Sequence, residues 1–308
     1  MASRRVGAAA FDHGAQFLTA RHPRFAAAVA QWQRVGVVAE WHRGTGGAHI
    51  RWRGNPDMTA VAKYLARDLT VRLQHRIVAL RPDAVGWLAE AHSGETFRSA
   101  AVLLTLPLPQ SLAVLDAGKV EVSPEIRAQI AGVEYERCLA VMAALDAPSV
   151  LPPPGGLAPP EGPIAWMADN QKKGISPIPA VTLHATPAFS LENWDGDRGL
   201  SGQRLLQAAA PWLGGKVTEF QVHGWRYSKP IQVLPTPTLM LSRSPPLFLA
   251  GDALGGSRVE GAALSGWAAA EALRQLFCED GVAGTARCRA KDEGERFGLR
   301  DLTERSQA

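Results

Sequence analysis

Apolar residues recur along this chain with two periods, every third or fourth position in some segments and every second position or in short runs in others. The first pattern predicts helices at residues 24–35, 58–67, 123–130 and 202–213. Asp57 fits the N-cap of the second of them. The second pattern predicts strands at residues 37–41, 48–53, 70–73, 76–81, 86–91, 101–106, 135–145, 180–185, 221–227 and 247–250.

The last of these strands leads into the most informative segment of the sequence. The apolar run 247–250 suits a buried parallel strand and ends at Gly251-Asp252. Gly255 and Gly256 follow, and then a helix rich in small residues. Glycines let the backbone approach a ligand, a carboxylate accepts hydrogen bonds from hydroxyl groups, and a helix N-terminus offers free N–H groups. The pattern favours a site for an electron-rich carbonyl or a phosphate, with an ordinary strand, loop and helix as the alternative.

The composition narrows the class of protein. The chain has 308 residues, of which 46% are hydrophobic and nine are tryptophans, enough for one large domain or two intertwined ones. The net charge of +4 is mild and the arginines are scattered, so we expect no nucleic-acid binding. No apolar run reaches 18 residues, so we expect no membrane span.

Cysteine and histidine usage excludes further kinds of site. Cys138, Cys278 and Cys288 include no Cys-x-x-Cys pair, and their odd number argues against a disulfide framework and fits a reducing cytoplasm. The eight histidines have no ligand spacing, so no metal site is expected. No Gly-x-Ser-x-Gly elbow marks a nucleophilic serine. We therefore expect a cytoplasmic protein without metal or serine catalysis.

Five segments of the sequence, taken in chain order, carry recognisable motifs. They are Met1–Arg5, Phe11–Phe17 (Phe-Asp-His-Gly-Ala-Gln-Phe), Ala165–Asn170, His223–Tyr227 and Gly251–Gly266. In this order they resemble the motifs of FAD-dependent amine oxidases, specifically the renalase-like branch, and the resemblance covers residues 1 to about 277.

The resemblance implies an α/β fold of mixed α+β character, in which a partial FAD-binding Rossmann-like domain is interleaved with an antiparallel-sheet substrate domain. The FAD-binding domain would comprise residues 1–20, 55–106 and 240–278, and the substrate domain residues 21–54 and 107–239. The charged segment 279–308 has little apolar periodicity and is expected to be a disordered tail.

The resemblance assigns cofactor contacts near the C-terminal end of the match. Gly251 and Asp252 should bind the ribityl or pyrophosphate region of FAD. The helix start at Arg258, Val259 and Glu260 should present its amides to the flavin N1–C2=O edge. Reduction places negative charge at that edge, and a helix N-terminus stabilises it.

Further contacts are implied near the beginning of the chain. Gly14, Ala15 and Gln16 should line the isoalloxazine, with a simple turn as the alternative. Arg4 and Arg5 stand where the family places cations near the phosphates, and solvated terminal charge is the other interpretation.

The remaining implied residues lie in the middle of the chain. Ile77 and Val78 should make adenine-side backbone contacts, although core strand residues would look identical. Trp225 would cover the substrate face of the flavin or belong to the core. Arg226 would pair with an anionic substrate or form a surface salt bridge. Lys172–Gly174 departs from the Lys-Pro-Gly-type sequence of relatives, so no substrate role is assigned to it.

One part of the family pattern is missing from the sequence. The family opens with a strand, a Gly-x-Gly-x-x-Gly turn and a helix that hold the FAD pyrophosphate, and no Gly-x-Gly-x-x-Gly occurs here. We expect roughly 30 or more residues of a first βαβ unit to be absent, through a misassigned start codon or a truncated gene. Strand 247–250 would then lie beside the missing strand, and the chain as given should bind FAD weakly and fold poorly.

The implied activity is that of a FAD-dependent oxidoreductase. Its small-molecule substrate, a dihydronicotinamide or an amine, would give a hydride to flavin N5, and dioxygen would reoxidise the flavin to form hydrogen peroxide. The sequence does not choose between the two substrates. The alternative is a non-catalytic truncated remnant that does not bind FAD stably.

Overall fold

A five-stranded antiparallel sheet is the largest layer of the computed structural model, which describes residues 1–44 and 49–279. Its strands, in spatial order, are β10 (Gly156–Leu157), β11 (Ile164–Asp169), β12 (Ala180–Ala185), β9 (Tyr135–Leu145) and β13 (Val217–Pro230). Cys138 to Leu145 of β9 are all buried, because both faces of this strand are covered.

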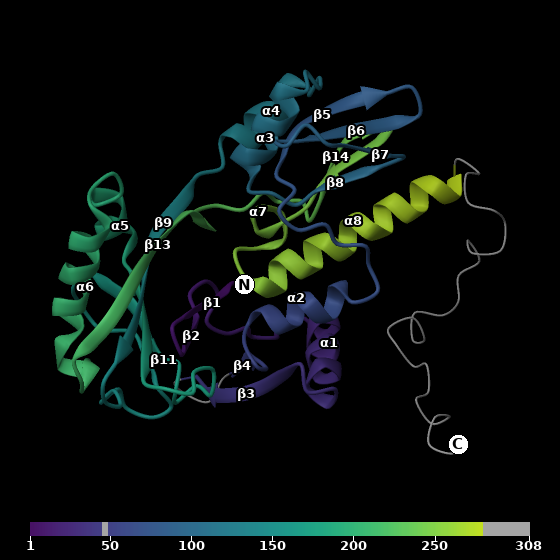
Figure 1. The fold of residues 1–308 in the computed structure, drawn as a ribbon. Coiled ribbons are helices and arrows are strands. Elements are labelled where there is room, and N and C mark those ends of the chain that lie inside the picture. Colours follow the sequence, from purple (N-terminus) through teal and green to yellow (C-terminus); the bar gives the residue numbers. More distant parts are fainter. Residues whose placement is uncertain (45–48, 280–308) are drawn as a thin grey trace, which may run out of the picture.

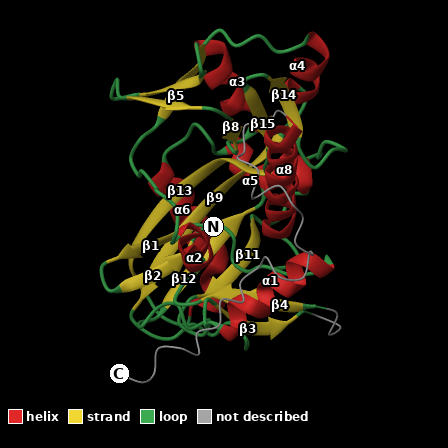
Figure 2. Cartoon of the chain, turned by 90° about the vertical axis from the view of Figure 1, so that its right-hand side faces the viewer, coloured by secondary structure: helices red, strands yellow, loops and turns green. Residues whose placement is uncertain are grey.

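Different elements pack against the two faces of this sheet (Figure 1). On one face lie α5 (Pro187–Glu192) and α6 (Arg198–Leu213), whose apolar side chains pack against Leu139, Val141 and Ala143. On the other face lies a hairpin of β1 (Ser3–Val6) and β2 (Ala9–Asp12), which packs against Met142 and Ala144. Figure 2, turned by 90°, shows this hairpin beside the long strands of the sheet.

A smaller sheet holds the Gly-Asp segment. β15 (Pro246–Leu249) is central, parallel to β8 (Val102–Leu104) and antiparallel to β14 (Leu239–Arg243). The expectation that this strand would lie beside a segment missing from the sequence is wrong, since β8 and β14 occupy both of its edges. After β15 come the short α7 (Asp252–Gly255) and the long α8 (Val259–Glu279), which lies beside this sheet in both views.

The other elements surround α8. A meander of β5 (Ile77–Asp83), β6 (Gly86–Ala91) and β7 (Thr96–Ser99) packs with α3 (Leu108–Ala117) and α4 (Pro124–Ala131) in one core. A second core joins α1 (Pro23–Arg34), the hairpin β3 (Val38–Arg43) and β4 (Ile50–Gly54), and α2 (Thr59–Ala66) to the first turns of α8.

Four sequence expectations differ from the observed elements. Residues 70–73 form no strand, and Val71 and Leu73 are exposed because no sheet pairs with them. No helix was predicted at α3, whose Pro109 stands in the first helical turn, where a missing N–H costs nothing. No strand was predicted at β7. The N-cap position of α2 is Met58, while the Asp57 carboxylate still accepts the Thr59 amide at 2.8 Å.

Two expectations about the class of protein, one on disulfides and one on membrane spans, can be compared with the described residues. Cys278 on α8 is disulfide-bonded, so the argument against disulfides does not hold for it, whereas Cys138 is buried and free. Among the helices of residues 1–44 and 49–279, none combines the length and apolar character that crossing a bilayer requires. The expected tail lies outside the described residues, apart from Glu279.

Candidate functional site

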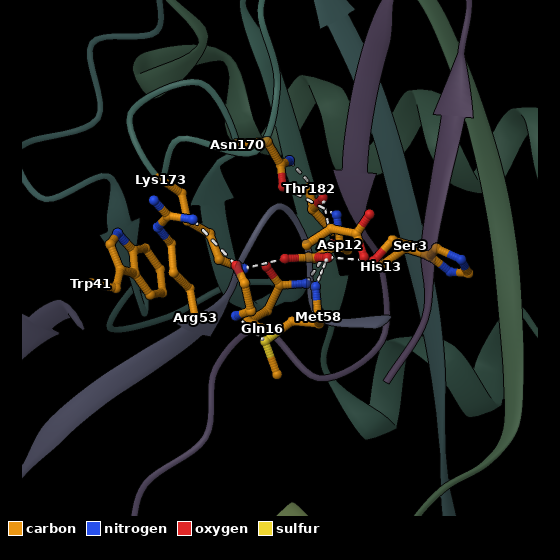
Figure 3. Close-up of polar contacts among 12 residues, drawn as sticks. Ser3, Asp12, His13, Gln16, Trp41, Arg53, Met58, Asn170, Lys173 and Thr182 are labelled. Carbon is orange, nitrogen blue, oxygen red and sulfur yellow. Dashed lines mark hydrogen bonds and ion pairs between the residues drawn. The ribbon is translucent and has the colours of Figure 1, made fainter. Parts of the chain in front are cut away.

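Asp12, at the end of β2, joins four separate parts of the chain (Figure 3). Its carboxylate accepts hydrogen bonds from Ser3 Oγ at 2.6 Å and the Met58 amide at 3.0 Å. The same carboxylate pairs with the Lys173 ammonium at 2.8 Å. Its backbone carbonyl accepts the Thr182 hydroxyl at 3.0 Å. Asp12 is wholly buried, so these bonds fix the start of the loop that follows it.

Lys173 comes from the loop between β11 and β12 and is equally buried. Burial lowers the pKa of its ammonium, and the Asp12 carboxylate partly opposes that change. Its Nζ also lies 5.1 Å from the centre of the Trp41 ring. The neighbouring Asn170 accepts the Asp12 amide at 3.2 Å and donates to Thr182 at 2.9 Å. The loop of the large sheet is thereby bound to the end of β2.

His13 begins a cluster of aromatic side chains on the hairpin side of the large sheet. Its ring stacks on Trp225 at 5.3 Å and meets the His223 ring edge-on at 5.0 Å. The His13 carbonyl accepts Trp225 Nε1 at 2.9 Å and is 3.1 Å from His184 Nε2. Burial is the main cause that lowers the pKa of His13 and of His184 to about 4, and the pKa of His223 falls as well. All three imidazoles are therefore neutral at pH 7.

The loop after His13 holds two buried polar atoms without a protein partner. Gln16 donates from Nε2 to the Asp12 carbonyl at 2.5 Å, which leaves its Oε1 buried and unpaired. His13 Nδ1 is buried and unpaired too. A Cβ on Gly14 would lie 3.2 Å from the Ala2 amide nitrogen, so only glycine fits there without a shift. Buried polar atoms normally have partners, which suggests that a ligand completes this loop.

The second part of the site is the turn from β15 into α8. Gly251 (φ 152°) and Gly256 (φ 118°) adopt backbone conformations that favour glycine. A Cβ on Gly261 would collide with the carbonyl oxygens of Gly255 and Gly256, so α8 begins in close contact with this turn. Asp252 stands at the first position of α7, and burial raises the pKa of its carboxyl. The first amides of α8 have no intrahelical acceptor and remain available to a ligand.

These two parts of the site lie together although some 240 residues separate them. Ala15 and Val259 pack against the same hydrophobic cluster, with Trp267. The Glu260 carboxylate accepts the amides of Arg21 and His22, both at 2.7 Å.

The N-terminal amine lies between the same two parts. Asp12 and Asp252 both raise its pKa, against a larger lowering by burial. The structure thus joins the segment that follows the Gly14–Gln16 loop to the beginning of α8 through Glu260.

Five other predicted residues lie elsewhere or serve other contacts. Arg4 reaches Gln221 of β13 at 3.4 Å, and Arg5 is exposed on the same hairpin. Ile77 packs in the core beside β15, and Val78 follows it on β5, which Figure 1 places far from β2. Arg258 is exposed, and its carbonyl accepts the Ala262 amide at the start of α8.

The sequence analysis offered both Trp225 and Arg226 as candidates for the substrate side of the site, but the two side chains lie on opposite faces of β13. Trp225 contacts His13 on the hairpin side. The guanidinium of Arg226 instead lies 5.6 Å from the ring of Trp194, which belongs to the core under α6. Side chains alternate along a strand, so the two cannot serve one pocket.

The family comparison covers most of the chain. Residues 10–274 match the sequence profile of the flavin containing amine oxidoreductases. The chain belongs to the flavin-containing amine oxidoreductase family. Within this family member, the matched range includes both the Gly14–Gln16 loop and the Gly251–Gly261 turn.

Two solved structures have a similar fold. One, from Exiguobacterium sp. 255-15, is described as a candidate protoporphyrinogen oxidase and shares 16% sequence identity with this chain. The match covers 77% of this chain and 54% of the Exiguobacterium chain, with a TM-score of 0.55. The other is a CLA-producing fatty acid isomerase from P. acnes, with 12% identity, coverage of 74% and 53%, and a TM-score of 0.51. This amine oxidoreductase family member thus spans slightly more than half the length of both.

The residues of this family member fit a flavin. The unpaired His13 Nδ1 and Gln16 Oε1 offer hydrogen-bonding atoms. The glycine turn at residues 251–256 permits close approach of the backbone, and the start of α8 supplies amides with partial positive charge. Gln16, the glycine turn and the start of α8 were predicted from the sequence as cofactor contacts, and these roles stay predictions. Asp12, His13, His184 and His223 were missed as site residues although two of them stand in the Phe11–Phe17 segment, and nothing in the sequence pairs Lys173 with Asp12.

Proposed function

We propose that this protein is a FAD-dependent oxidoreductase of the renalase-like branch of its family. The motifs Phe11–Phe17 and His223–Tyr227 support the branch, since both supply side chains to one cluster. The observation that carries the proposal is the link between the segment after the Gly14–Gln16 loop and the first turn of α8, where the Glu260 carboxylate accepts the amides of Arg21 and His22. Such a place offers glycine, unpaired polar atoms and helix amides to a flavin ring.

The electrostatics of the His13 cluster favour a planar substrate that is neutral or anionic. His13, His223 and Trp225 offer flat rings, and Arg4 contributes positive charge that lowers the pKa of both histidines. A protonated amine would need a free carboxylate, and that of Asp12 is engaged by three donors. We therefore propose a dihydronicotinamide as the substrate class, with an amine as the second candidate.

Each group in the site has a defined part in this proposal. With FAD bound, the substrate gives a hydride to the flavin, and dioxygen takes the electrons to become hydrogen peroxide. The imidazoles and Trp225 would hold the substrate ring. Because these side chains are neutral, they would not repel the positive charge that the substrate gains when it loses the hydride. Asp252 would accept hydrogen bonds from cofactor hydroxyls. The Lys173–Asp12 pair would hold the loop against the sheet.

Cofactor binding is tested first. Titration of the purified protein with FAD, followed by flavin fluorescence, should show saturable binding of low affinity, as the sequence analysis expects for the chain as given. Acid precipitation of the saturated protein should leave the yellow colour in the supernatant, since we expect non-covalent binding. A yellow pellet would contradict non-covalent binding. Absence of saturable binding would favour the alternative, a remnant that does not hold FAD stably.

Substrate class is tested with the FAD-saturated protein. Anaerobic mixing with the 2- and 6-dihydro isomers of NAD(P)H should bleach the flavin absorbance, and subsequent admission of air should yield hydrogen peroxide. Primary and secondary amines should bleach it much more slowly. Faster bleaching by amines would overturn the dihydronicotinamide assignment while leaving the oxidoreductase assignment in place.

A further inference from the structure

Three arginines gather around one tryptophan on the helix-covered face of the large sheet. The guanidinium carbons of Arg198, Arg137 and Arg226 lie 4.7, 5.0 and 5.6 Å from the centre of the Trp194 ring. They come from α6, β9 and β13, so the fold, and not one local segment, brings the three positive charges together. Gly224 makes room for them, because a Cβ there would lie 3.1 Å from Trp194 and 3.3 Å from Arg198.

These charges have no partner among the described residues. Within residues 1–44 and 49–279, no ion pair involves Arg137, Arg198 or Arg226. Arg198 Nη1 is buried without any hydrogen-bond partner. Two acidic groups are adjacent to the cluster in sequence: Asp197, whose carboxylate caps α6 by accepting the Leu200 amide at 2.8 Å, and Glu136, which pairs with Lys229 at 3.6 Å. A buried N–H of a cation without an acceptor is costly, and an anion would relieve both that cost and the mutual repulsion.

The position of this arginine cluster separates it from the flavin-binding part of the molecule. Trp194 packs in the core between the sheet and α6, whereas His13 and Trp225 lie on the hairpin side of the same sheet. Figure 1 shows α6 and the hairpin β1–β2 on opposite sides of the sheet. An anion bound at Trp194 would therefore lie on the other face of the sheet from His223, whose pKa is lowered by burial, by Arg4 and also by Arg198.

Solvent and ligands can reach two of the three arginines through a groove, and the third, Arg198, is half-buried. Arg226 is exposed, and it lines a groove of about 580 Å³ together with Arg137. Most of the other lining side chains are apolar or aromatic, among them Leu191. Two glutamates also line the groove, and one of them, Glu136, pairs with Lys229 at 3.6 Å. The groove offers an apolar surface beside the positive charges.

We propose that Arg137, Arg198 and Arg226 form a binding site for the phosphate group of a small molecule. Guanidinium groups form paired hydrogen bonds with oxyanions, and three of them match the charge and the several oxygens of a phosphate better than those of a single carboxylate. The groove beside Arg137 and Arg226 would receive the less polar remainder of the molecule.

The test uses inorganic phosphate and needs no flavin, so its result is independent of the proposed oxidoreductase activity. Isothermal titration calorimetry at constant ionic strength should show one saturable phosphate site. Arg198→Gln and Arg226→Gln should each weaken phosphate binding roughly tenfold to a hundredfold. The matched control is Arg204→Gln, because Arg204 also lies on α6 over an aromatic ring but bonds Asn193 and lies outside the cluster. It should leave phosphate binding unchanged.

Several results would overturn the site. They are the absence of saturable phosphate binding to the wild type, equal affinity in Arg226→Gln, and tighter binding of acetate than of phosphate. Arg226 is exposed, so Arg226→Gln should fold even where Arg198→Gln does not, and thermal melts followed by circular dichroism check this. Arg198→Lys keeps the charge without the paired donors and should bind phosphate at an intermediate level.

Discussion

The ammonium of Lys173 and the carboxylate of Asp12 lie 2.8 Å apart, and neither side chain is exposed. Lys173 belongs to the loop after β11, and Asp12 ends β2, so the pair ties the large sheet to the segment that begins the candidate flavin site. A buried charge without its partner is strongly unfavourable, and each residue of this pair therefore requires the other.

Lys173→Met should lower the free energy of unfolding by about 3–5 kcal/mol, because it leaves the Asp12 carboxylate buried without its cation. Urea denaturation measures this. Lys63→Met, at an exposed position on α2, is the control and should change stability by less than about 0.5 kcal/mol. The double variant Asp12→Asn with Lys173→Met should cost less than the sum of the single changes. Strict additivity would show that the two residues do not act as a pair.

Gly261→Ala and Gly266→Ala should have opposite effects on stability although both lie on α8. A Cβ at Gly261 would collide with the carbonyls of Gly255 and Gly256, whereas a Cβ at Gly266 meets nothing within 4 Å. We expect Gly261→Ala to destabilise the protein by about 1–3 kcal/mol and to weaken FAD binding. Gly266→Ala should stabilise it by up to about 1 kcal/mol. Thermal melts of both variants decide this, and equal melting temperatures would refute the close contact.

Particular elements show how much of the fold and of the candidate site the sequence predicts. The bounds of β9 and β12 agree with the apolar runs 135–145 and 180–185, because buried strands leave an unmistakable local pattern. The glycine turn at residues 251–256 was identified as a candidate ligand site because glycine spacing is local. The partner of Lys173 lies 161 positions away, and the opposite facing of Trp225 and Arg226 depends on how β13 packs. Such long-range relationships leave no local signal.

Acid should destabilise the protein in part through His13. Its pKa is about 4 in the fold and 6.5 in the unfolded chain, mainly because of burial. The unfolded state thus binds a proton between pH 6.5 and 4 that the folded state does not, and stability present above pH 6.5 is lost as the pH falls. His13→Gln should make the loss between pH 6.5 and 5 smaller by at most about 1.5 kcal/mol, since solvent screens part of the effect, as measured by urea denaturation. His92→Gln, at an exposed position, should not alter the slope.

Asp252→Ala should weaken FAD binding more than Trp225→Ala does. Loss of the carboxylate removes a charge-assisted hydrogen bond of roughly 1.5–3 kcal/mol, a tenfold to hundredfold rise in Kd. Trp225→Ala should mainly slow flavin reduction by substrate, since Trp225 stacks on His13 in the proposed substrate cluster. Fluorescence titration with FAD compares the two, with Asp68→Ala at an exposed position as the control. An unchanged Kd for Asp252→Ala would refute its assignment.

Hydrogen–deuterium exchange with and without saturating FAD tests the central claim most directly, because that claim joins two distant segments in one flavin site. The amides of the Gly14–Phe17 loop and of the Gly251–Gly261 turn should both exchange more slowly when FAD is present, since both would contact the cofactor. AMP, which lacks the flavin, should leave exchange in the Gly14–Phe17 loop unchanged. Slower exchange in both segments with FAD is the predicted result; unchanged exchange in either segment at saturation would contradict the account.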